Sequence, residues 1–371
     1  MRLLLTNKYG HRPDYVLLVA FFFLVVFGLF ALSSASSDLG KIRYDDAYYY
    51  LKRQITLGLF GGLLGFALGY ILYYKNHKRW AIFLLLANLA ALVLVLISPL
   101  GATRGGSARW LELGPLSFQP SELLKIAFII YIAAWLSRAG HHRKMDFGRG
   151  FLPFLLLSGF VSILLFLQPA TSTVFIVLAT AFIMYFMSGA RFSYIGLAGL
   201  MAVVAVGVLV YFTPYRLERV TAFLSPSEDP AGAGYHLNQA LITLGAGGLT
   251  GVGFGGSTNK YLYLPESIGD SIFVIIGEEL GFIGATILIT VLFIVVLRGL
   301  FIARNVRDEF GRLMLVGFCA IIGIQTFVNI AALSGLIPLT GVTLPFVSYG
   351  SSSLVTFMTM AGIMTNISRY D

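Results

Sequence analysis

The sequence predicts an all-α, polytopic membrane protein with about ten transmembrane helices. Two observations of its composition predict this fold class. Of the 371 residues, 57% are hydrophobic and only 12% are charged, whereas a soluble domain averages roughly 25% charged residues. Apolar stretches also recur along the whole chain, and a helix of about 20 such residues spans a bilayer. Because a backbone in lipid must satisfy its own hydrogen bonds, each stretch is expected to be a helix.

The same composition excludes several other classes of protein. A soluble enzyme, a disordered chain and a secreted disulfide scaffold do not fit. The formal charge of +9 suggests nucleic acid at first, but the basic residues gather on one side of the predicted membrane, so no nucleic-acid partner is expected. Cys319 is the only cysteine, which excludes an internal disulfide and a cysteine metal site. We expect it to be a small core residue, and residues 1–371 to form a single integral-membrane domain.

Ten apolar runs define the predicted spans. They cover approximately Tyr15–Ser34, Gln54–Tyr74, Trp80–Leu100, Glu122–Leu136, Gly150–Leu167, Ser172–Met187, Tyr194–Phe212, Ser271–Leu297, Leu313–Leu333 and Ser351–Ile367. The first run is longer than the 7–15 residues of a signal-peptide core, so it is expected to remain as a helix. The fifth and sixth runs are separated only by residues 168–171 and are expected to form a tight helical hairpin.

The distribution of basic residues predicts the orientation. With the N-terminus in the cytoplasm, 16 of the 26 Lys and Arg residues lie on the cytoplasmic side, as the positive-inside rule requires. An even number of spans then places both termini in the cytoplasm. The short basic inside loops are interpreted as topology signals.

The non-helical segments that could carry a reaction or bind a ligand lie on the opposite, outer side of the predicted membrane. The longest such segment is a large extracytoplasmic loop between the seventh and eighth helices, at about residues 213–270, and the apolar stretch 237–244 predicts a short helix within it. The glycine-dense run 245–256 has no βαβ context, so it predicts tight turns beneath that helix rather than a dinucleotide site. Two further outer loops, 101–121 and 334–350, are rich in Gly, Pro and hydroxyl residues.

Ionisable residues in or beside the spans are the first candidates for function, because burying a charge in lipid is costly. Glu122 and Lys125 open the fourth helix three residues apart, so they share a face and can pair. Asp270 opens the eighth helix. The adjacent Glu278 and Glu279 are expected to make a buried structural pair with a basic or amide group.

Two amides of the ninth helix, Gln325 and Asn329, lie four residues apart. We expect them to hydrogen-bond to neighbouring helices, as polar side chains do between transmembrane segments.

Three outer-face segments, residues 109–125, 263–281 and 338–350, carry long motifs that resemble those of the SEDS family of RodA and FtsW. Residues 109–125 (RWLELGPLSFQPSELLK) resemble that family's RWI-LG-QPSEL-K signature. Residues 263–281 (YLPESIGDSIFVIIGEELG) are similar to YLPEAHTDFIFAIIGEELG. Residues 338–350 (PLTGVTLPFVSYG) are similar to P-TG-PLPFVSYGGS.

The resemblance covers essentially the whole chain. It implies a peptidoglycan polymerase that joins lipid II units, the undecaprenyl-pyrophosphate disaccharide-pentapeptides, on the outer face of a bacterial plasma (inner) membrane. It implies that Asp270 is the essential catalytic carboxylate, that a class B penicillin-binding protein is the partner beside other divisome or elongasome membrane proteins, and that no organic cofactor takes part.

The chain also departs from the family pattern. Residues 168–173 read QPATST where the family often has QPDLGT, so a carboxylate is missing there. Residues 267–270 read SIGD in place of AHTD, and residues 348–352 read SYGSS in place of SYGGS. The segment Tyr48–Gln54 and the GVTLPFVSYG run favour the cell-division branch over the elongation branch.

The implied reaction needs a base for the attacking sugar hydroxyl and a partner for the negative charge of the departing pyrophosphate. An α-linked donor that yields a β-linked product means inversion in one displacement. We expect Asp270 to be the base, with a pKa raised by partial desolvation. Capping of the eighth helix is a compatible structural role for this aspartate.

The remaining site residues are expected to bind the substrate. The set comprises Arg109, Glu122, Lys125, Lys260, Glu266 and Ser348. Arg suits bidentate phosphate contacts and Lys acts as a point charge, although Arg109 alternatively fixes a loop and Lys125 alternatively only pairs with Glu122. A divalent cation (Mg or Mn), with Asp270 or Glu266 as oxygen ligands, would also help to stabilise the negative charge of the pyrophosphate.

Two other functions remain open from the sequence. An outer cavity with basic residues also suits a flippase that transports lipid II, although no convincing repeat relates the two halves of the chain. A non-catalytic scaffold for cell division would need no acid beside cations. Polymerisation of labelled lipid II by the purified protein and its partner separates the three.

Overall fold

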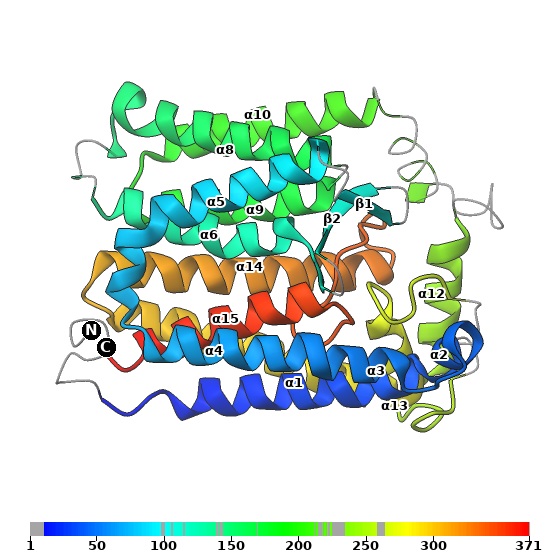
Figure 1. Cartoon of the computed structure of the whole chain (residues 1–371). Coiled ribbons are helices and arrows are strands. Elements are labelled where there is room, and N and C mark those ends of the chain that lie inside the picture. The colour runs from blue at the N-terminus through cyan, green and yellow to red at the C-terminus, as the bar shows by residue number, and fades with distance from the viewer. Residues whose placement is uncertain are drawn as a thin grey trace.

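A computed structural model shows a bundle of long helices that lie side by side, with a small sheet and a short helix at one end (Figure 1). The structure describes residues 11–97, 101–104, 107–113, 116–138, 140, 144–168, 170–211, 213, 217, 219, 221, 223–224, 234–257 and 264–370. The two described chain ends meet, because His11 N donates to Arg369 O over 2.7 Å. They therefore lie at the same end of the bundle, as ten spans require.

All ten predicted spans contain a helix in their described residues, which leave out residues 98–100 and 212. They correspond to α1 (Tyr15–Ala35), α3–η2–α4 (Tyr49–Arg53, Gln54–Leu59, Phe60–Ile71), η3–α5 (Tyr74–Asn76, His77–Ile97), α6 (Pro120–Leu136), η4–α8 (Phe147–Phe151, Leu152–Leu167), α9 (Thr171–Met187), α10 (Phe192–Tyr211), α13 (Ile272–Asn305), α14 (Glu309–Leu333) and α15 (Ser351–Ile367). Among the described residues, six helices are long and apolar enough to cross a bilayer by themselves. The chain is a multi-pass membrane protein, and the fold class is confirmed.

Several boundaries differ from the prediction by a few residues. The second span begins five residues early, because α3 precedes the π-helical turn η2, which starts at Gln54. The eighth continues past Leu297 to Asn305. Its last turns carry Arg298 and Arg304, and long basic side chains keep their charges in water while their stems cover apolar surface.

The outer loop at 101–121 holds a structure that the all-α prediction missed. It forms a three-stranded antiparallel sheet of β1 (Gly101–Arg104), β2 (Ser107–Leu113) and β3 (Leu116–Phe118) in the order β1-β2-β3. Leu111 pairs with Gly101 on one side and with Phe118 on the other. The strands are too short to show a clear alternation in the sequence, so only the geometry reveals them. The sheet leads directly into α6.

A short outer helix, α12 (Tyr235–Ala246), confirms the prediction at 237–244. The glycine loop, residues 247–256, follows it and packs against a break in α13. The break lies at Gly281, whose φ of 66° and ψ of −167° are not helical. Only glycine adopts this combination readily.

The glycine loop satisfies the backbone groups that the break frees. Val252 N donates to Glu278 O (2.9 Å) and Gly253 N to Glu279 O (3.1 Å). In return, the N–H groups of residues 282 and 283 donate to the carbonyl oxygens of residues 248 and 249. A Cβ atom on Gly281 would lie 2.3 Å from Gly251 N. This exchange lets α13 break without leaving polar backbone unpaired.

The two glutamates before the break are buried, as predicted, but their described partners are hydroxyls. Ser34 Oγ of α1 donates to Glu279 Oε1 over 2.6 Å, and Ser257 Oγ donates to Glu278 Oε2. Both pairs tie the broken segment of α13 to its neighbours. These two bonds add serine hydroxyls to the expected surroundings of the glutamates.

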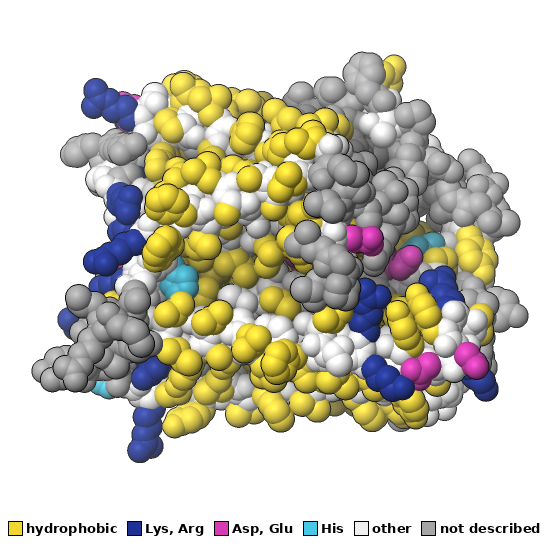
Figure 2. Space-filling view, in the orientation of Figure 1, with side chains coloured by type: hydrophobic (Ala, Val, Ile, Leu, Met, Phe, Trp, Pro, Cys, Tyr) yellow, Lys and Arg dark blue, Asp and Glu magenta, His cyan; other side chains and the backbone are white. Residues whose placement is uncertain are grey.

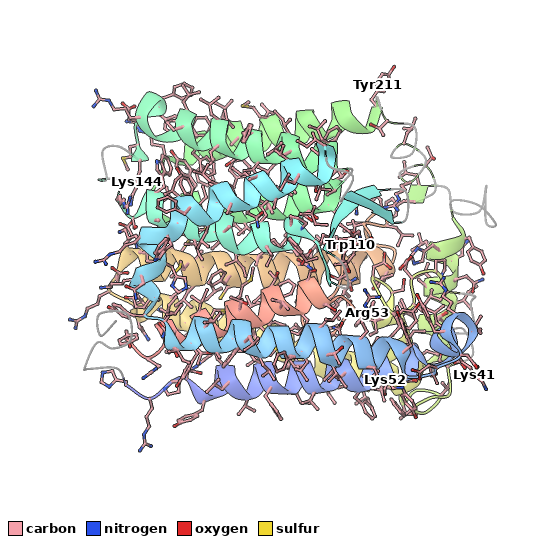
Figure 3. All side chains as sticks on the ribbon, in the orientation of Figure 1. Lys41, Lys52, Arg53, Trp110, Lys144 and Tyr211 are labelled. Atoms are coloured by element: carbon pink, nitrogen blue, oxygen red, sulfur yellow. The ribbon has the colours of Figure 1, made fainter. Side chains whose placement is uncertain are left out.

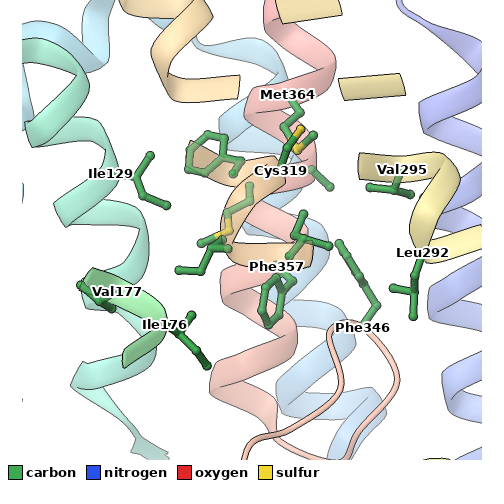
Figure 4. Close-up of a cluster of buried hydrophobic side chains, with 14 of the residues drawn as sticks. Ile129, Ile176, Val177, Leu292, Val295, Cys319, Phe346, Phe357 and Met364 are labelled. Atoms are coloured by element: carbon green, nitrogen blue, oxygen red, sulfur yellow. The ribbon is translucent and has the colours of Figure 1, made fainter. Parts of the chain in front are cut away.

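The core lies between α6, α9, α13, α14 and α15. Figure 4 shows Cys319 of α14 among buried side chains from these helices. Cys319 is fully buried, which confirms its expected core role. The α4 and α15 helices approach especially closely, because a Cβ atom on Gly362 would lie 2.2 Å from Phe66 O. Small residues permit this kind of contact between membrane helices.

Charged side chains gather at the two ends of the bundle, while hydrophobic side chains cover its length (Figure 2). In Figure 3, Lys144 lies at one end and Lys41, Lys52 and Arg53 lie at the other. The prediction assigned Lys144 to the inside and the other three to the outside. The structure therefore separates these residues as the predicted orientation requires.

Candidate active site

Asp270 lies at the N-terminal end of α13, at the close of a turn that covers residues 264–271. Gly269 N and Ser271 N both donate to Glu266 O, over 2.9 and 3.3 Å. Glu266 has a φ of 48°, the left-handed conformation that such a tight turn needs. Leu264 and Ile268 are buried and anchor the turn, while Asp270 is half-buried. The turn thus holds Glu266 and Asp270 close together.

The 338–350 loop lies against Asp270. Asn329 Nδ2 on α14 donates both to Asp270 O (2.7 Å) and to Val342 O (2.6 Å), so it ties the acid to this loop. Tyr349 N donates to Ile268 O over 2.9 Å. At Gly341, which has a φ of 64°, a Cβ atom would lie 3.6 Å from Asp270 Oδ2. The carboxylate therefore faces this loop across a short gap. Asn329 hydrogen-bonds to loop backbone rather than to a neighbouring helix as predicted.

The surroundings raise the pKa of the Asp270 carboxyl to about 7. Burial is the main cause, and the negative charge of Glu266 adds to it. Three influences act in the opposite direction: the Ser271 hydroxyl, the backbone of Asp270 itself and the positive charge of Arg219. A carboxyl group with a pKa near 7 is suited to accept a proton at neutral pH.

His236, Ser271 and Arg219 surround the acid and were not assigned to the site from the sequence. The His236 Nε2 atom of α12 lies 2.8 Å from Ser271 Oγ, and Ser271 Oγ donates to Pro265 O (3.0 Å) and lies 3.4 Å from Asp270 Oδ1. Burial and Arg219 lower the pKa of His236 to about 4, so the ring is neutral at pH 7. Arg219 Nη1 donates to Leu339 O over 3.1 Å.

One sequence signal pointed to these residues. Arg219 and His236 lie in the large outer loop that was singled out for its length, but nothing in their spacing shows that they fold back onto Asp270. Arg219 is a cation whose charge acts on both Asp270 and His236.

Glu122 and Lys125 form the predicted pair on α6, and the pair is buried. Lys125 Nζ donates to Glu122 Oε1 (2.6 Å) and to Gln325 Oε1 (2.9 Å), and it lies 5.4 Å from the centre of the Phe357 ring. Gln325 Nε2 in turn donates to Thr343 O over 2.9 Å. Lys125 is thus connected through Gln325 to the backbone of the 338–350 loop. Only 2% of the Lys125 side chain is exposed, so the contacts fit the structural alternative given for this residue.

Arg109 on β2 contacts a different element from Asp270. Its Nε donates to Gln168 O (2.9 Å) in the turn between α8 and α9, and Gln168 Nε2 donates to Leu92 O. This contact fits the loop-fixing alternative. A link to the site exists through the start of α9, where Ser172 Oγ donates to Thr340 O over 2.5 Å. Arg109 thus helps to hold the hairpin that supports the 338–350 loop.

Ser348 and Lys260 complete the predicted set. Ser348 is buried, and its Oγ accepts a hydrogen bond from Leu344 N over 2.7 Å, so it closes a turn within the 338–350 loop. Gly350 N donates to Gln54 Oε1 (3.2 Å) and joins that loop to the second span. Lys260 lies outside the described residues.

The described residues contain no group of three or more His, Cys, Asp or Glu side chains able to enclose a metal ion. The pair of Asp270 and Glu266 is a smaller oxygen donor set. Mg²⁺ commonly binds one or two protein carboxylates and takes its other ligands from water and substrate phosphates. These two residues fit that kind of shared site.

Comparison with known proteins gives matches over nearly the whole chain. A family model described as "Cell cycle protein", which covers FtsW, RodA and SpoVE, matches residues 15–371. Stage V sporulation protein E of Bacillus subtilis (strain 168) is 39% identical over 363 residues, which cover 96% of this chain and 97% of that protein. A probable peptidoglycan glycosyltransferase FtsW of Geobacter sulfurreducens (strain ATCC 51573 / DSM 12127 / PCA) is 38% identical over 369 residues, 99% and 98% of the two chains.

Solved structures agree with these relatives. A chain from a peptidoglycan synthase complex that coordinates polymerization and crosslinking superposes with a TM-score of 0.81 at 30% identity, over 97% of this chain and 99% of that chain. The rod shape determining protein RodA of Thermus thermophilus gives a TM-score of 0.70 at 26% identity, over 97% and 98%. The resemblance seen in the three outer motifs is confirmed, and the chain belongs to the SEDS family of membrane proteins that includes FtsW, RodA and SpoVE.

Proposed function

We propose that this SEDS protein is a peptidoglycan glycosyltransferase that polymerises lipid II, with Asp270 as the general base. The observation that carries the proposal is the half-buried Asp270 carboxyl, with its pKa of about 7, between the 338–350 loop and Arg219. Relatives named peptidoglycan glycosyltransferase FtsW support the substrate class.

The proposed step is a single displacement. Asp270 accepts the proton of the attacking sugar hydroxyl as that oxygen forms a bond to the anomeric carbon of the donor. The bond from the anomeric carbon to the pyrophosphate oxygen breaks, and undecaprenyl pyrophosphate leaves with the electron pair. The configuration at the anomeric carbon inverts, so no covalent sugar–enzyme intermediate forms. His236, through Ser271, would hold the side of the turn that carries the base.

Positive charge would stabilise the departing pyrophosphate. Arg219 is the best-placed described cation for this role, because its charge already acts on Asp270. Glu266 or Asp270 would supply an oxygen ligand to a divalent cation (Mg or Mn), and such an ion would add positive charge beside the leaving group. Lys125 and Arg109 would support the site through the 338–350 loop and the α8–α9 turn.

The cellular setting follows from the same relatives. We propose that both termini are cytoplasmic, since the end of the bundle where they meet carries Lys144 and the other predicted inside cations. The site then faces the outer leaflet. A class B penicillin-binding protein is the proposed partner, in line with the synthase complex that this chain superposes on. The relatives named FtsW and SpoVE favour cell division over elongation.

The deciding experiment incubates the purified chain and its partner with labelled lipid II and measures glycan strand length. Wild-type protein is expected to make long strands, and Asp270→Asn to make none while eluting as a folded monomeric peak in detergent. Asp46→Asn is the matched control, because Asp46 is an outer aspartate that pairs with Lys52 at 2.8 Å. Strands from Asp270→Asn, or transport of lipid II without polymerisation, would contradict the proposal and favour a scaffold or a flippase.

A further inference from the structure

A polar cavity opens at the end of the bundle opposite Asp270, since Asp270 precedes α13 and the cavity lies beyond its last residue. Its volume is about 540 Å³. The charged and hydroxyl groups that line it come from the end of α6, the segment before α8, the end of α9 and the α13–α14 turn. They include Arg138, Lys144, Ser188, Arg307, Glu309 and Arg312.

Positive charge dominates this cavity. Four cations face one carboxylate among the described lining residues. Lys144 pairs with Glu309 and is only 5% exposed, and its carbonyl oxygen accepts a hydrogen bond from Tyr185 Oη over 2.9 Å. Arg312 lies 3.9 Å from the same Glu309 carboxylate. Because Glu309 balances one of the four cations, the lining carries a net charge of three positive units.

Arg138 and Arg307, at the opening of the cavity, are free to bind an anion that is not part of the protein. Arg138 and Arg307 are exposed. Among the described residues, Arg307 has no hydrogen bond or ion pair, and Arg138 Nη2 donates only to the carbonyl oxygen of Lys78, over 3.4 Å. A guanidinium group binds phosphate oxygens in pairs, which suits a tetrahedral phosphate in this space.

The surroundings of the cavity point to a lipid as the source of the phosphate. The cavity lies at the ends of membrane-spanning helices, where lipid headgroups would meet the protein. Next to Ser188, the apolar side chains of Phe186, Met187 and Phe192 are exposed, by 48%, 48% and 77%. They offer acyl chains a surface beside the cations, whereas free phosphate would use none of it. Basic pockets between membrane helices recognise anionic headgroups in this way.

We propose that this cavity binds the phosphate of an anionic phospholipid, with Arg138, Arg307 and Arg312 as its ligands. Basic residues at this end also orient the chain in the membrane. A specific site differs from that general role because only the arginines that line the cavity contribute to it.

The test measures lipid retention by the purified full-length chain in detergent. Native mass spectrometry counts bound phosphatidylglycerol or phosphatidylcholine, and thermal unfolding is followed with each lipid and with inorganic phosphate alone. The variant is Arg307→Gln with Arg312→Gln. The matched control is Arg79→Gln with Arg304→Gln, which removes two exposed arginines from the same end of the bundle but outside the cavity.

The wild-type chain is expected to retain phosphatidylglycerol and to gain thermal stability from it. The cavity variant is expected to bind about 30-fold more weakly, because each basic residue near an anionic headgroup contributes about a fivefold factor, while the control retains wild-type binding. Equal binding of both lipids, an equal loss in the control, or an unchanged cavity variant would overturn the proposal. Stabilisation by inorganic phosphate but not by phosphatidylglycerol would overturn the lipid assignment.

Discussion

The raised pKa of Asp270 predicts a steep pH dependence of lipid II polymerisation. A general base must be ionised to accept a proton, and the pKa of Asp270 is about 7 rather than 3.8. The ionised fraction then rises from about 10% at pH 6 to about 90% at pH 8, so the rate should increase about tenfold between these values. An aspartate with an ordinary pKa would give the same rate at both.

The perturbation that tests this cause is Glu266→Gln. The negative charge of Glu266 raises the pKa of Asp270, so its removal should lower that pKa and increase the rate at pH 6 more than at pH 8. The assay is the initial rate of strand formation with the partner present, at constant ionic strength. Asp46→Asn is the control and should keep the wild-type profile. An unchanged profile in Glu266→Gln would refute the electrostatic reasoning.

The same shift predicts how stability depends on pH. Between pH 4 and pH 7 the folded state binds a proton at Asp270 that the unfolded state has lost, so unfolding free energy falls as pH rises through this window. A shift of about three pKa units corresponds to at most about 4 kcal/mol. The thermal stability of Asp270→Asn, measured relative to the wild type, should therefore increase as the pH is raised from 5 to 8. Parallel curves would argue against a buried, perturbed carboxyl group.

Three further predictions concern the parts that hold the site. Gly281→Ala should destabilise the protein by about 3 kcal/mol in detergent unfolding, because a Cβ there would meet a backbone nitrogen of the glycine loop at 2.3 Å; Gly159→Ala, with open space around it, should not. Lys125→Met should cost about 3–5 kcal/mol in the same measurement, since it leaves a buried carboxylate without its cation. Asn329→Ala should cost about 1–3 kcal/mol and lower the polymerisation rate at every pH, because the backbone of Asp270 loses its tie to the 338–350 loop; a normal rate would show that this tie does not position the acid.

Local patterns in the sequence were enough to predict the bundle. The ten apolar runs predicted the helices because length and hydropathy decide which segments cross a bilayer. The pairing of Glu122 with Lys125 followed from their spacing on one helix face. The glycines of the run 245–256 predicted turns, which the structure has at 247–256, because residues 245 and 246 end α12. Each of these features depends on neighbours within a few residues.

Features that depend on distant contacts were not predictable in this way. Arg219 and His236 reach Asp270 only because the large outer loop folds back over α13. In the sequence, Gly281 is one more residue of a long apolar run, and nothing near it predicts the break. The break is explained by the glycine loop, which hydrogen-bonds to the backbone on both sides of Gly281. The small sheet at 101–118 has strands too short for a visible alternation. The hydrogen bonds from Ser34 and Ser257 to Glu279 and Glu278 also join separate parts of the chain.

The interruption of α13 has a mechanical consequence for the acid next to it. Only the nine residues from Ile272 to Leu280 connect Asp270 to the interruption, and the rod that crosses the bilayer begins on its far side. The glycine loop holds the two pieces together, because it forms backbone hydrogen bonds on both sides of Gly281. Displacement of the longer piece therefore reaches Asp270 through this loop as well as through the helix, and a change in the loop is transmitted to the acid through a segment of only nine residues.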